Sequence, residues 1–341
     1  MFIVTILCLL VVAVAAVLVC VSARSTDVPR SGVRGGRAVG TTHSEQFTWS
    51  DISDRDSEWF SSVLDRHVPP GAYASEPMNQ HGHAWCGACW LVACVQVVQD
   101  KLNIREAPAE SHMRDHRAFA FDMQAAADDA ALLFAADVLK RDHSVGLLVS
   151  TPRQWTACMG GEPSMALEAM RVGTLRLGAN RSGASTWQSR SDPSRAGRVP
   201  GDIVVRSVRS IDPNPQAFKN ELLNGPLVVC TRSAPLWSLD SLGRTSAGSG
   251  ERDHVMAIIG WTTVGGKECW ITRNSWGADA RSAVHSKPED VRGCAGGKCA
   301  AERTEWNSPG DRPGFVYIPT ALAENAMGVY DSPSGCFAVD V

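Results

Sequence analysis

The sequence predicts an α+β protein with two lobes, because helix-forming segments fill its first half and short β-type segments its second half. Cys89 to Ile104 places apolar residues at helical spacing, residues 118–140 are rich in Ala, and residues 164–172 form a shorter helical pattern. Short runs rich in β-branched residues follow, each bounded by Gly or polar residues, at 226–230, 254–261, 269–273 and 314–318. Helices and strands segregated in this way predict two lobes, and a cleft between them is a natural binding site.

Length and composition are those of a folded chain without a surface for nucleic acid. The 341 residues are 44% hydrophobic, which is enough for one large or two small cores. The net charge is −3, and residues of both signs are scattered along the chain without a basic stripe. We therefore expect no nucleic-acid partner.

The first 23 residues form an apolar segment that ends before Arg24. A run of roughly 20 apolar residues is long enough to cross a bilayer, and residues 21–23 are small, as at a signal-peptidase site. No basic region precedes the segment and several arginines follow it, so a signal peptide and a signal anchor both remain open. Residues 24–55, rich in Gly, Ser, Thr and Arg, are expected to be a spacer or short pro-segment, and residues 56–341 the folded domain.

Either interpretation sends the chain into the secretory pathway. We expect an extracellular or lysosome-like compartment, or attachment to a membrane through residues 1–23. Of the eleven cysteines, Cys8 and Cys20 lie in the apolar segment, so nine remain. An odd number in an exported chain predicts at least one free thiol.

The segment "NQHGHAWCGACW", Asn79 to Trp90, is compatible with three kinds of chemistry. Cys86 and Cys89 are spaced as in a thioredoxin dithiol, but the residues before them read as a loop instead of a strand. Together with His81 and His83 they would crowd four zinc ligands into nine residues, whereas structural zinc usually draws its ligand pairs from separated turns. The third possibility is a nucleophilic Cys89 at the start of a helix, which needs a distant His and a residue that orients it.

One later block supplies both of those residues. His254 begins the apolar run 254–261, and Asn274 follows the next β-type run twenty residues later. Two adjacent strands can place this His and Asn side by side, with Trp276 covering the hydrogen bond between them. A helix N-terminus and an imidazolium both lower the pKa of a thiol, which favours the attacking thiolate. His254 then acts as base and acid, and Asn274 fixes its tautomer.

These blocks resemble those of the papain-like cysteine peptidases. "CGACW" matches the family's Cys motif, "DHV…GW" and "RNSWG" match its His and Asn blocks, "CMGG" resembles its Cys-x-Gly-Gly turn, and "NGPLVV" its central strand. The resemblance covers residues 55–341 and implies a papain-like fold with a helical left lobe, a β-barrel-like right lobe and the active-site cleft between them. It also implies a monomer that hydrolyses peptides or proteins through a thioester, without a cofactor or metal. Gln80 and the backbone N–H of Cys89 would stabilise the oxyanion.

Within the family, the spacing before the cysteines resembles the cathepsin X branch, also called cathepsin Z. Most papain-like enzymes place a Gln three residues before the first Cys, but here that position is His83. Gln80 lies three residues further back and is followed by His81, as in the extra loop of the cathepsin X branch. The resemblance implies a carboxypeptidase in which protonated His81 pairs with the C-terminal carboxylate of the substrate. His83 competes for that role, and an ordinary endopeptidase is the alternative.

The same resemblance assigns substrate contacts and disulfide bonds. Gly160 and Gly161 would present backbone to an extended substrate, while Pro163, Val255 and the strand after Pro226 would line an apolar S2 pocket. The implied disulfides are Cys86–Cys158 and Cys230–Cys336. Cys230 stands one residue later than its counterpart, and such a shift turns a strand side chain to the opposite face. The alternative is therefore a free Cys230 thiol facing the S2 pocket.

The chain also departs from the family. About 36 residues separate Gly277 from Gly314, where the family has a short connection, and this insertion, 278–313, holds Cys294 and Cys299. We expect those two cysteines to bond to each other. The stretch 105–145 is longer than expected, and the pro-segment has no cysteine to cap the nucleophile. An inactive papain-fold binding protein is the alternative from another functional class.

Overall fold

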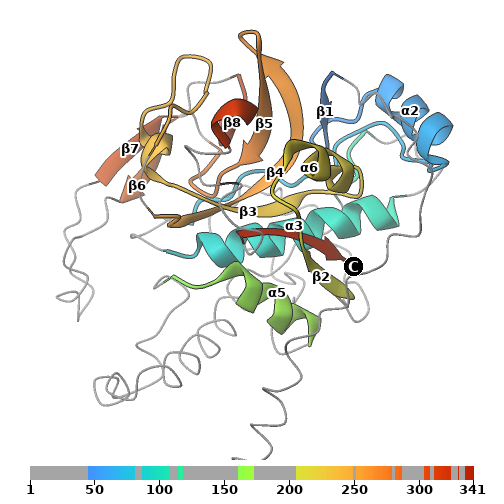
Figure 1. Ribbon diagram of the computed structural model, residues 1–341, viewed down its shortest axis with the longest axis horizontal. Coiled ribbons are helices and arrows are strands. Elements are labelled where there is room, and N and C mark those ends of the chain that lie inside the picture. Colours follow the sequence, from blue (N-terminus) through green and yellow to red (C-terminus); the bar gives the residue numbers. More distant parts are fainter. Residues whose placement is uncertain are drawn as a thin grey trace, which may run out of the picture. The chain divides into compact units, whose positions relative to one another are not determined.

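The computed structural model describes one compact unit, which lies within His43–Val341 (Figure 1). The described residues are 45–80, 87–107, 114–117, 160–172, 205–248, 251–278, 281–285, 303–307, 311–323, 329 and 335–341. The apolar segment 1–23 and the expected helix at 118–140 lie outside these ranges. No helix in the described ranges is long and apolar enough to span a membrane.

An antiparallel sheet of seven strands forms the larger part of the unit. Its strands lie in the order β2 (Ser207–Ser210), β9 (Cys336–Asp340), β3 (Leu227–Thr231), β4 (His254–Val264), β5 (Lys267–Arg273) and β8 (Phe315–Pro319). The short strand β1 (Phe47–Thr48) also pairs with β4. A separate hairpin joins β6 (Arg281–His285) to β7 (Arg303–Asn307). The long β4–β5 hairpin is central to the sheet, and its two strands begin and end at the His and Asn blocks.

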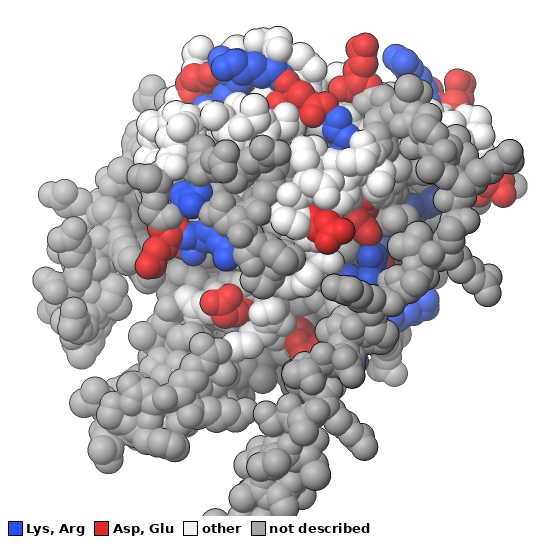
Figure 2. Space-filling model, viewed as in Figure 1, with Lys and Arg blue, Asp and Glu red and all other residues white. Residues whose placement is uncertain are grey.

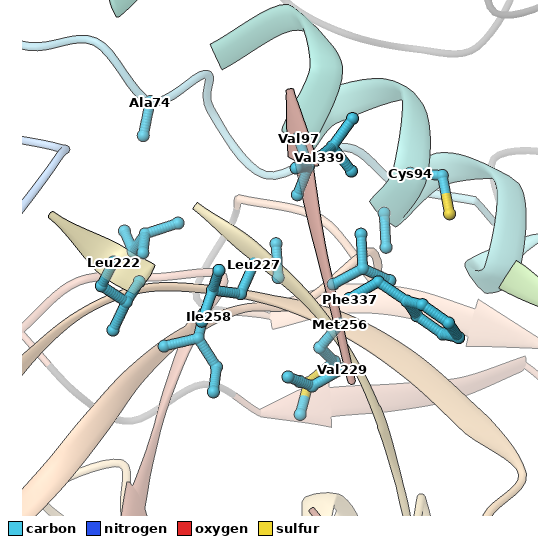
Figure 3. Packing of buried hydrophobic residues seen from close by; sticks show 14 of the residues in the cluster. Ala74, Cys94, Val97, Leu222, Leu227, Val229, Met256, Ile258, Phe337 and Val339 are labelled. Atoms are coloured by element: carbon cyan, nitrogen blue, oxygen red, sulfur yellow. The ribbon is translucent and has the colours of Figure 1, made fainter. Parts of the chain in front are cut away.

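One helix, α3 (Cys89–Glu106), is buried along almost its whole length. A helix that is apolar on all sides belongs in a core, and α3 lies between the sheet and helix α5 (Pro163–Arg171) (Figure 1). Figure 3 shows Val97 and Cys94 of α3 close to Val339 and Phe337 of β9, while Val229 of β3 and Met256 of β4 lie together away from the helix. The sheet therefore fixes the axis of α3, and with it the position of Cys89 at its first residue.

The remaining helices cover the edges of the sheet. Helix α2 (Asp54–Leu64) begins with a capping box in which Ser53 and Asp56 bind each other's backbone N–H groups. Helix α6 (Pro215–Leu222) begins after the Asn214 cap and packs on β4, and the short helices η4 (Ala234–Trp237) and α7 (Thr320–Ala323) lie in connections. Figure 2 shows positive and negative side chains interspersed on the described part of one face.

The folded unit begins earlier than the boundary expected at residue 56. Phe47, Trp49 and Ile52 are buried in the same core as α3 and the sheet. The rings of Phe47 and Trp49 pack against Phe60, and Phe47 also packs against Trp261. Strand β1 crosses β4 at Gly260, where an added Cβ would lie 2.7 Å from the Cα of Thr48. The Gly/Ser-rich composition of residues 24–44 concealed this change, because the buried aromatic residues start only at Phe47.

A buried ion pair connects α3 to β5. Arg273 Nη1 donates to Asp100 Oδ2 at 2.7 Å, and both side chains are 0% exposed. The other carboxylate oxygen accepts from the backbone N–H and the hydroxyl of Ser75, at 2.7 and 2.9 Å. Because α3 begins at Cys89 and β5 ends one residue before Asn274, this pair holds the two sides of the candidate site together.

Candidate active site

Cys89 is the first residue of α3, where the backbone N–H groups of a helix point outward. Its residue surface is 8% exposed, and its thiol is not in a disulfide. The backbone N–H groups of Val255 and Trp90 both donate to its sulfur. The sulfur therefore lies against the residue that follows His254, and these two N–H groups favour the thiolate.

His254 begins β4, and its ring is oriented by the end of β5. Its Nε2 atom lies 2.8 Å from Oδ1 of Asn274, which also accepts the backbone N–H of Ser275 at 2.8 Å. Two hydrogen bonds to that atom identify it as the carbonyl oxygen of the amide, so His254 carries its proton on Nε2. The Nδ1 atom is then the one that can accept a proton.

Two tryptophans cover this pair from one side. The ring of Trp276 lies 4.9 Å from the ring of His254, and Trp276 is 3% exposed. Trp237 of η4 packs against Trp276 at 4.8 Å and is 44% exposed. Trp276 thus shields the His254–Asn274 bond from water, as its spacing predicted, while Trp237 extends the aromatic surface outward. No sequence signal marked Trp237, because it lies far from every motif.

Gln80 reaches the site despite the altered loop length before Cys86. Its backbone N–H donates to the carbonyl of Ser275 at 2.7 Å, and the Ser275 hydroxyl donates to its Oε1 atom. The adjacent backbone is also pinned, since Gly277 N–H donates to the Met78 carbonyl at 3.0 Å. These contacts tie Gln80 to the residue after Asn274. Sequence reasoning did not single out Ser275, although it stands inside the Asn block.

Burial decides the protonation of both reacting groups in the free protein. It raises the pKa of Cys89 to about 12, against the opposing effect of the Val255 and Trp90 N–H groups. It lowers the pKa of His254, although the bond to Asn274 and the charge of Asp253 act in the other direction. In the free protein Cys89 therefore rests as a thiol and His254 as a neutral imidazole. A neutral imidazole is the form that can take the thiol proton.

The two glycines of the substrate turn differ in their surroundings. Gly160 has a φ of +95°, and an added Cβ would have no heavy atom within 4 Å. Gly161 lies directly on the ring of Trp90, where an added Cβ would come within 2.6 Å of Cε2. The turn thus leaves space above Gly160 and rests on the residue next to Cys89. Pro163 starts α5 and is buried, and its carbonyl accepts the thiol of Cys94 at 3.6 Å.

The structure does not contain the expected Cys230–Cys336 disulfide, because both thiols are free. Cys336 pairs in register with Val229, so Cys230 projects from the opposite face of the sheet. Cys230 pairs with Val255 in the β3–β4 ladder and is partly exposed. The structure agrees with the alternative expectation, in which Cys230 is a free thiol on the side of Cys89.

Several predicted site residues lie outside the described ranges. These are His81, His83, Cys86, Cys158, Cys294 and Cys299. Within the part of the chain that the structure describes, no group of three or more His, Cys, Asp or Glu side chains is arranged to hold a metal ion.

Comparison with known proteins defines the class. A model of the papain family of cysteine proteases matches residues 119–300, more than half of the chain, and this range contains His254 and Asn274. The chain therefore belongs to the papain family of cysteine proteases and has its α+β fold. The expected fold class is confirmed.

Individual relatives are more distant. Cathepsin O of Mus musculus is 33% identical over 131 residues, which make up 36% of this chain and 40% of cathepsin O. Bromelain from Ananas comosus in complex with the E64 inhibitor is 15% identical, with a TM-score of 0.49 over 88% of this chain and 100% of its own. A chain from a study of the mite allergens Blo t 1 and Der p 1 is 16% identical, with a TM-score of 0.46 over 89% of this chain and 74% of its own.

Proposed function

We propose that the protein is a cysteine peptidase that uses Cys89 as nucleophile and His254 as base. The observation that carries this proposal is the His254–Asn274 hydrogen bond of 2.8 Å, made next to Val255, whose backbone N–H donates to the Cys89 thiol at the first residue of α3. A structural His would not need an oriented amide, a covering Trp276 ring and a neighbouring N–H that donates to the thiol. Together these features match what nucleophilic catalysis by a thiol requires.

The reaction follows from these positions. His254 Nδ1 takes the proton of the Cys89 thiol, and the sulfur attacks the carbonyl carbon of the substrate. The imidazolium, held by Asn274, then gives its proton to the leaving amine, and the C–N bond breaks to leave a thioester on Cys89. Water attacks the thioester after giving a proton to His254, and the acid product leaves as the thiol is restored.

Gln80 would stabilise the oxyanion in both steps. The Ser275 hydroxyl binds the acceptor end of the Gln80 amide, which orients the nitrogen end as the donor. The backbone N–H of Cys89, at the open end of α3, would be the second donor. This assignment gives the Ser275 side chain a positioning role.

Substrate would bind in an extended form across the turn at Gly160 and Gly161. Its second residue before the scissile bond would point into an S2 pocket between Pro163 and Val255. Cys94, bonded to the Pro163 carbonyl, lies within electrostatic reach of both Cys89 and Cys230.

A cathepsin X-like carboxypeptidase is the finer form of this proposal. Gln80 is pinned to Ser275, so the loop that contains His81 starts at the oxyanion donor itself. A protonated His81 at that point would bind the terminal carboxylate of a substrate. Such a charge-assisted bond contributes about 1.5–3 kcal/mol, so C-terminal amidation should lower kcat/KM roughly ten- to a hundredfold.

His81→Ala should abolish the preference for a free C-terminal carboxylate, and His83→Ala serves as the matched control. Equal cleavage of amidated and free-acid peptides, within the chain, would indicate an endopeptidase.

The compartment and the remaining cysteines belong to the same proposal. We propose an exported protein with disulfides Cys86–Cys158 and Cys294–Cys299, which peptide mapping of the unreduced protein would detect.

To test the peptidase activity, the purified chain and its Cys89→Ala variant are incubated with a mixed peptide library, and the products are identified by mass spectrometry. Cleavage by the first and none by the second supports a peptidase. A folded wild-type chain that cuts no peptide would indicate a binding protein.

A further inference from the structure

The face of the sheet beside the nucleophile carries a row of three residues from three strands. Cys230 of β3 pairs with Val255 of β4, whose N–H donates to Cys89. On its other side, Cys230 lies next to Gly335, at the start of β9, since the register pairs Val229 with Cys336. The Cβ of Cys230 is 3.5 Å from the position that a Cβ on Gly335 would take. The row therefore runs from Gly335 through Cys230 to Val255, the residue that contacts Cys89.

Arg252 fills the space that the missing side chain of Gly335 leaves. Its Nη1 atom is 2.2 Å from the position that the Cβ of residue 335 would take, and its Cζ atom is 3.4 Å from that position. Arg252 is exposed, and no salt bridge to it is found among the described residues. Its guanidinium, which forms no ion pair with any residue that the structure describes, thus lies at the end of the row, two residues before His254 in the chain.

The electrostatic effect of Arg252 reaches into the row. Burial raises the pKa of Cys230, and the charge of Arg252 opposes this rise by a smaller amount. Arg252 also opposes the rise in the pKa of Cys336. Glu162, at the N-terminal end of α5, raises the pKa of Cys230 but contributes less than Arg252. The positive charge is therefore the stronger of the two at this end of the cleft.

We infer that Arg252 makes the S2 pocket select peptides with an acidic side chain at P2, two residues before the scissile bond. The inference rests on the proposed peptidase function, which places P2 between Pro163 and Val255. A Glu side chain is long enough to pass the small Cys230 and reach a guanidinium, which binds carboxylates through paired N–H donors. The sequence predicted an apolar S2 pocket. Arg252 would add a positive charge at one end of it.

The test compares two peptides that differ only by Glu or Gln at P2. Because Arg252 is exposed, the wild-type kcat/KM ratio should favour Glu by about three- to tenfold at low salt and decline as salt is added. Arg252→Gln should bring the ratio to about one. Glu162→Gln should raise the ratio, since it removes the opposing charge. Arg206→Gln, which removes an exposed charge beside β2, is the matched control and should leave the ratio unchanged.

A second variant moves the guanidinium without removing its charge. In Gly335→Ala the new methyl group takes the place of Nη1, and the flexible end of Arg252 can shift aside. This variant should lower the Glu preference while the hydrolysis of the Gln peptide changes little. A Glu-to-Gln ratio of one in the wild type, or a ratio that Arg252→Gln leaves unchanged, overturns the inference.

Binding measurements separate this inference from the peptidase proposal. Fluorescence anisotropy of the two labelled peptides with Cys89→Ala protein gives the same comparison without turnover. If the wild type cuts neither peptide, the peptidase proposal fails, but tighter binding of the Glu peptide that Arg252→Gln abolishes still supports the pocket. Equal binding of the two peptides contradicts the pocket whether or not cleavage occurs.

Discussion

The Asp100–Arg273 pair joins the helix that carries Cys89 to the strand that precedes Asn274, so breaking it should weaken both fold and site. In Asp100→Asn the Arg273 cation remains fully buried without its counter-ion. Removing one partner of a buried ion pair costs about 3–5 kcal/mol, a large part of the roughly 5–15 kcal/mol that stabilises a typical domain. Activity should fall as well, because Asn274 would lose the support of its neighbour.

Replacing both Asp100 and Arg273 should lower the free energy of unfolding much less than replacing one of them. Nε and Nη2 of Arg273 have no hydrogen-bond partner among the described residues, so the pair is itself incompletely satisfied. The double variant Asp100→Leu/Arg273→Met removes both charges and those orphaned donors. We expect it to lie within about 1–2 kcal/mol of the wild type, as for other buried pairs replaced by apolar residues.

Urea unfolding, followed by Trp fluorescence, measures these differences. Most of the tryptophans named above are buried, so their emission reports the core. The reasoning predicts a strong coupling energy between the two substitutions. It is refuted if Asp100→Asn costs less than about 1 kcal/mol, or if the cost of the double variant equals the sum of the costs of Asp100→Leu and Arg273→Met made singly.

Three further predictions concern the site. Burial lowers the pKa of His254, so kcat/KM should fall on the acid side of its pH profile with an apparent pKa below the usual histidine value of about 6.5. An apparent pKa above that value would contradict a neutral His254 base. Gly161→Ala should cost about 1–3 kcal/mol in urea unfolding and slow turnover, because its methyl group displaces the Trp90 ring, whereas the methyl group of Gly160→Ala displaces no neighbour and should slow turnover by standing in the path of the substrate backbone. Gln80→Ala should lower kcat about a hundred- to a thousandfold with little change in KM, and an unchanged kcat would exclude it as oxyanion donor.

Local sequence patterns predicted the elements that carry the site. The helix expected from Cys89, the strand expected from His254 and the strand expected to end at Arg273 all occur, as α3, β4 and β5. Each has an unambiguous apolar run and a clear boundary residue. Their packing then follows from burial, which brings Cys89 close to the backbone next to His254.

Local sequence patterns could not predict contacts between segments that lie far apart in the sequence. The Asp100–Arg273 pair joins residues 173 positions apart, and a charged residue in an apolar run gives no sign of its partner. The face on which Cys230 lies depends on the register with β9, which a resemblance alone could not decide. The place of Arg252 likewise depends on a glycine in another strand.

The central claim is that His254 activates Cys89, and the rate of alkylation at Cys89 tests it most directly. A peptidyl chloromethyl ketone is added to the native wild type and to His254→Ala, and the modified residue is located by mass spectrometry. The account predicts one adduct, at Cys89, formed at least about a hundredfold faster in the wild type than in the variant. Equal rates in the two proteins, or a first adduct at the partly exposed Cys230, would contradict it.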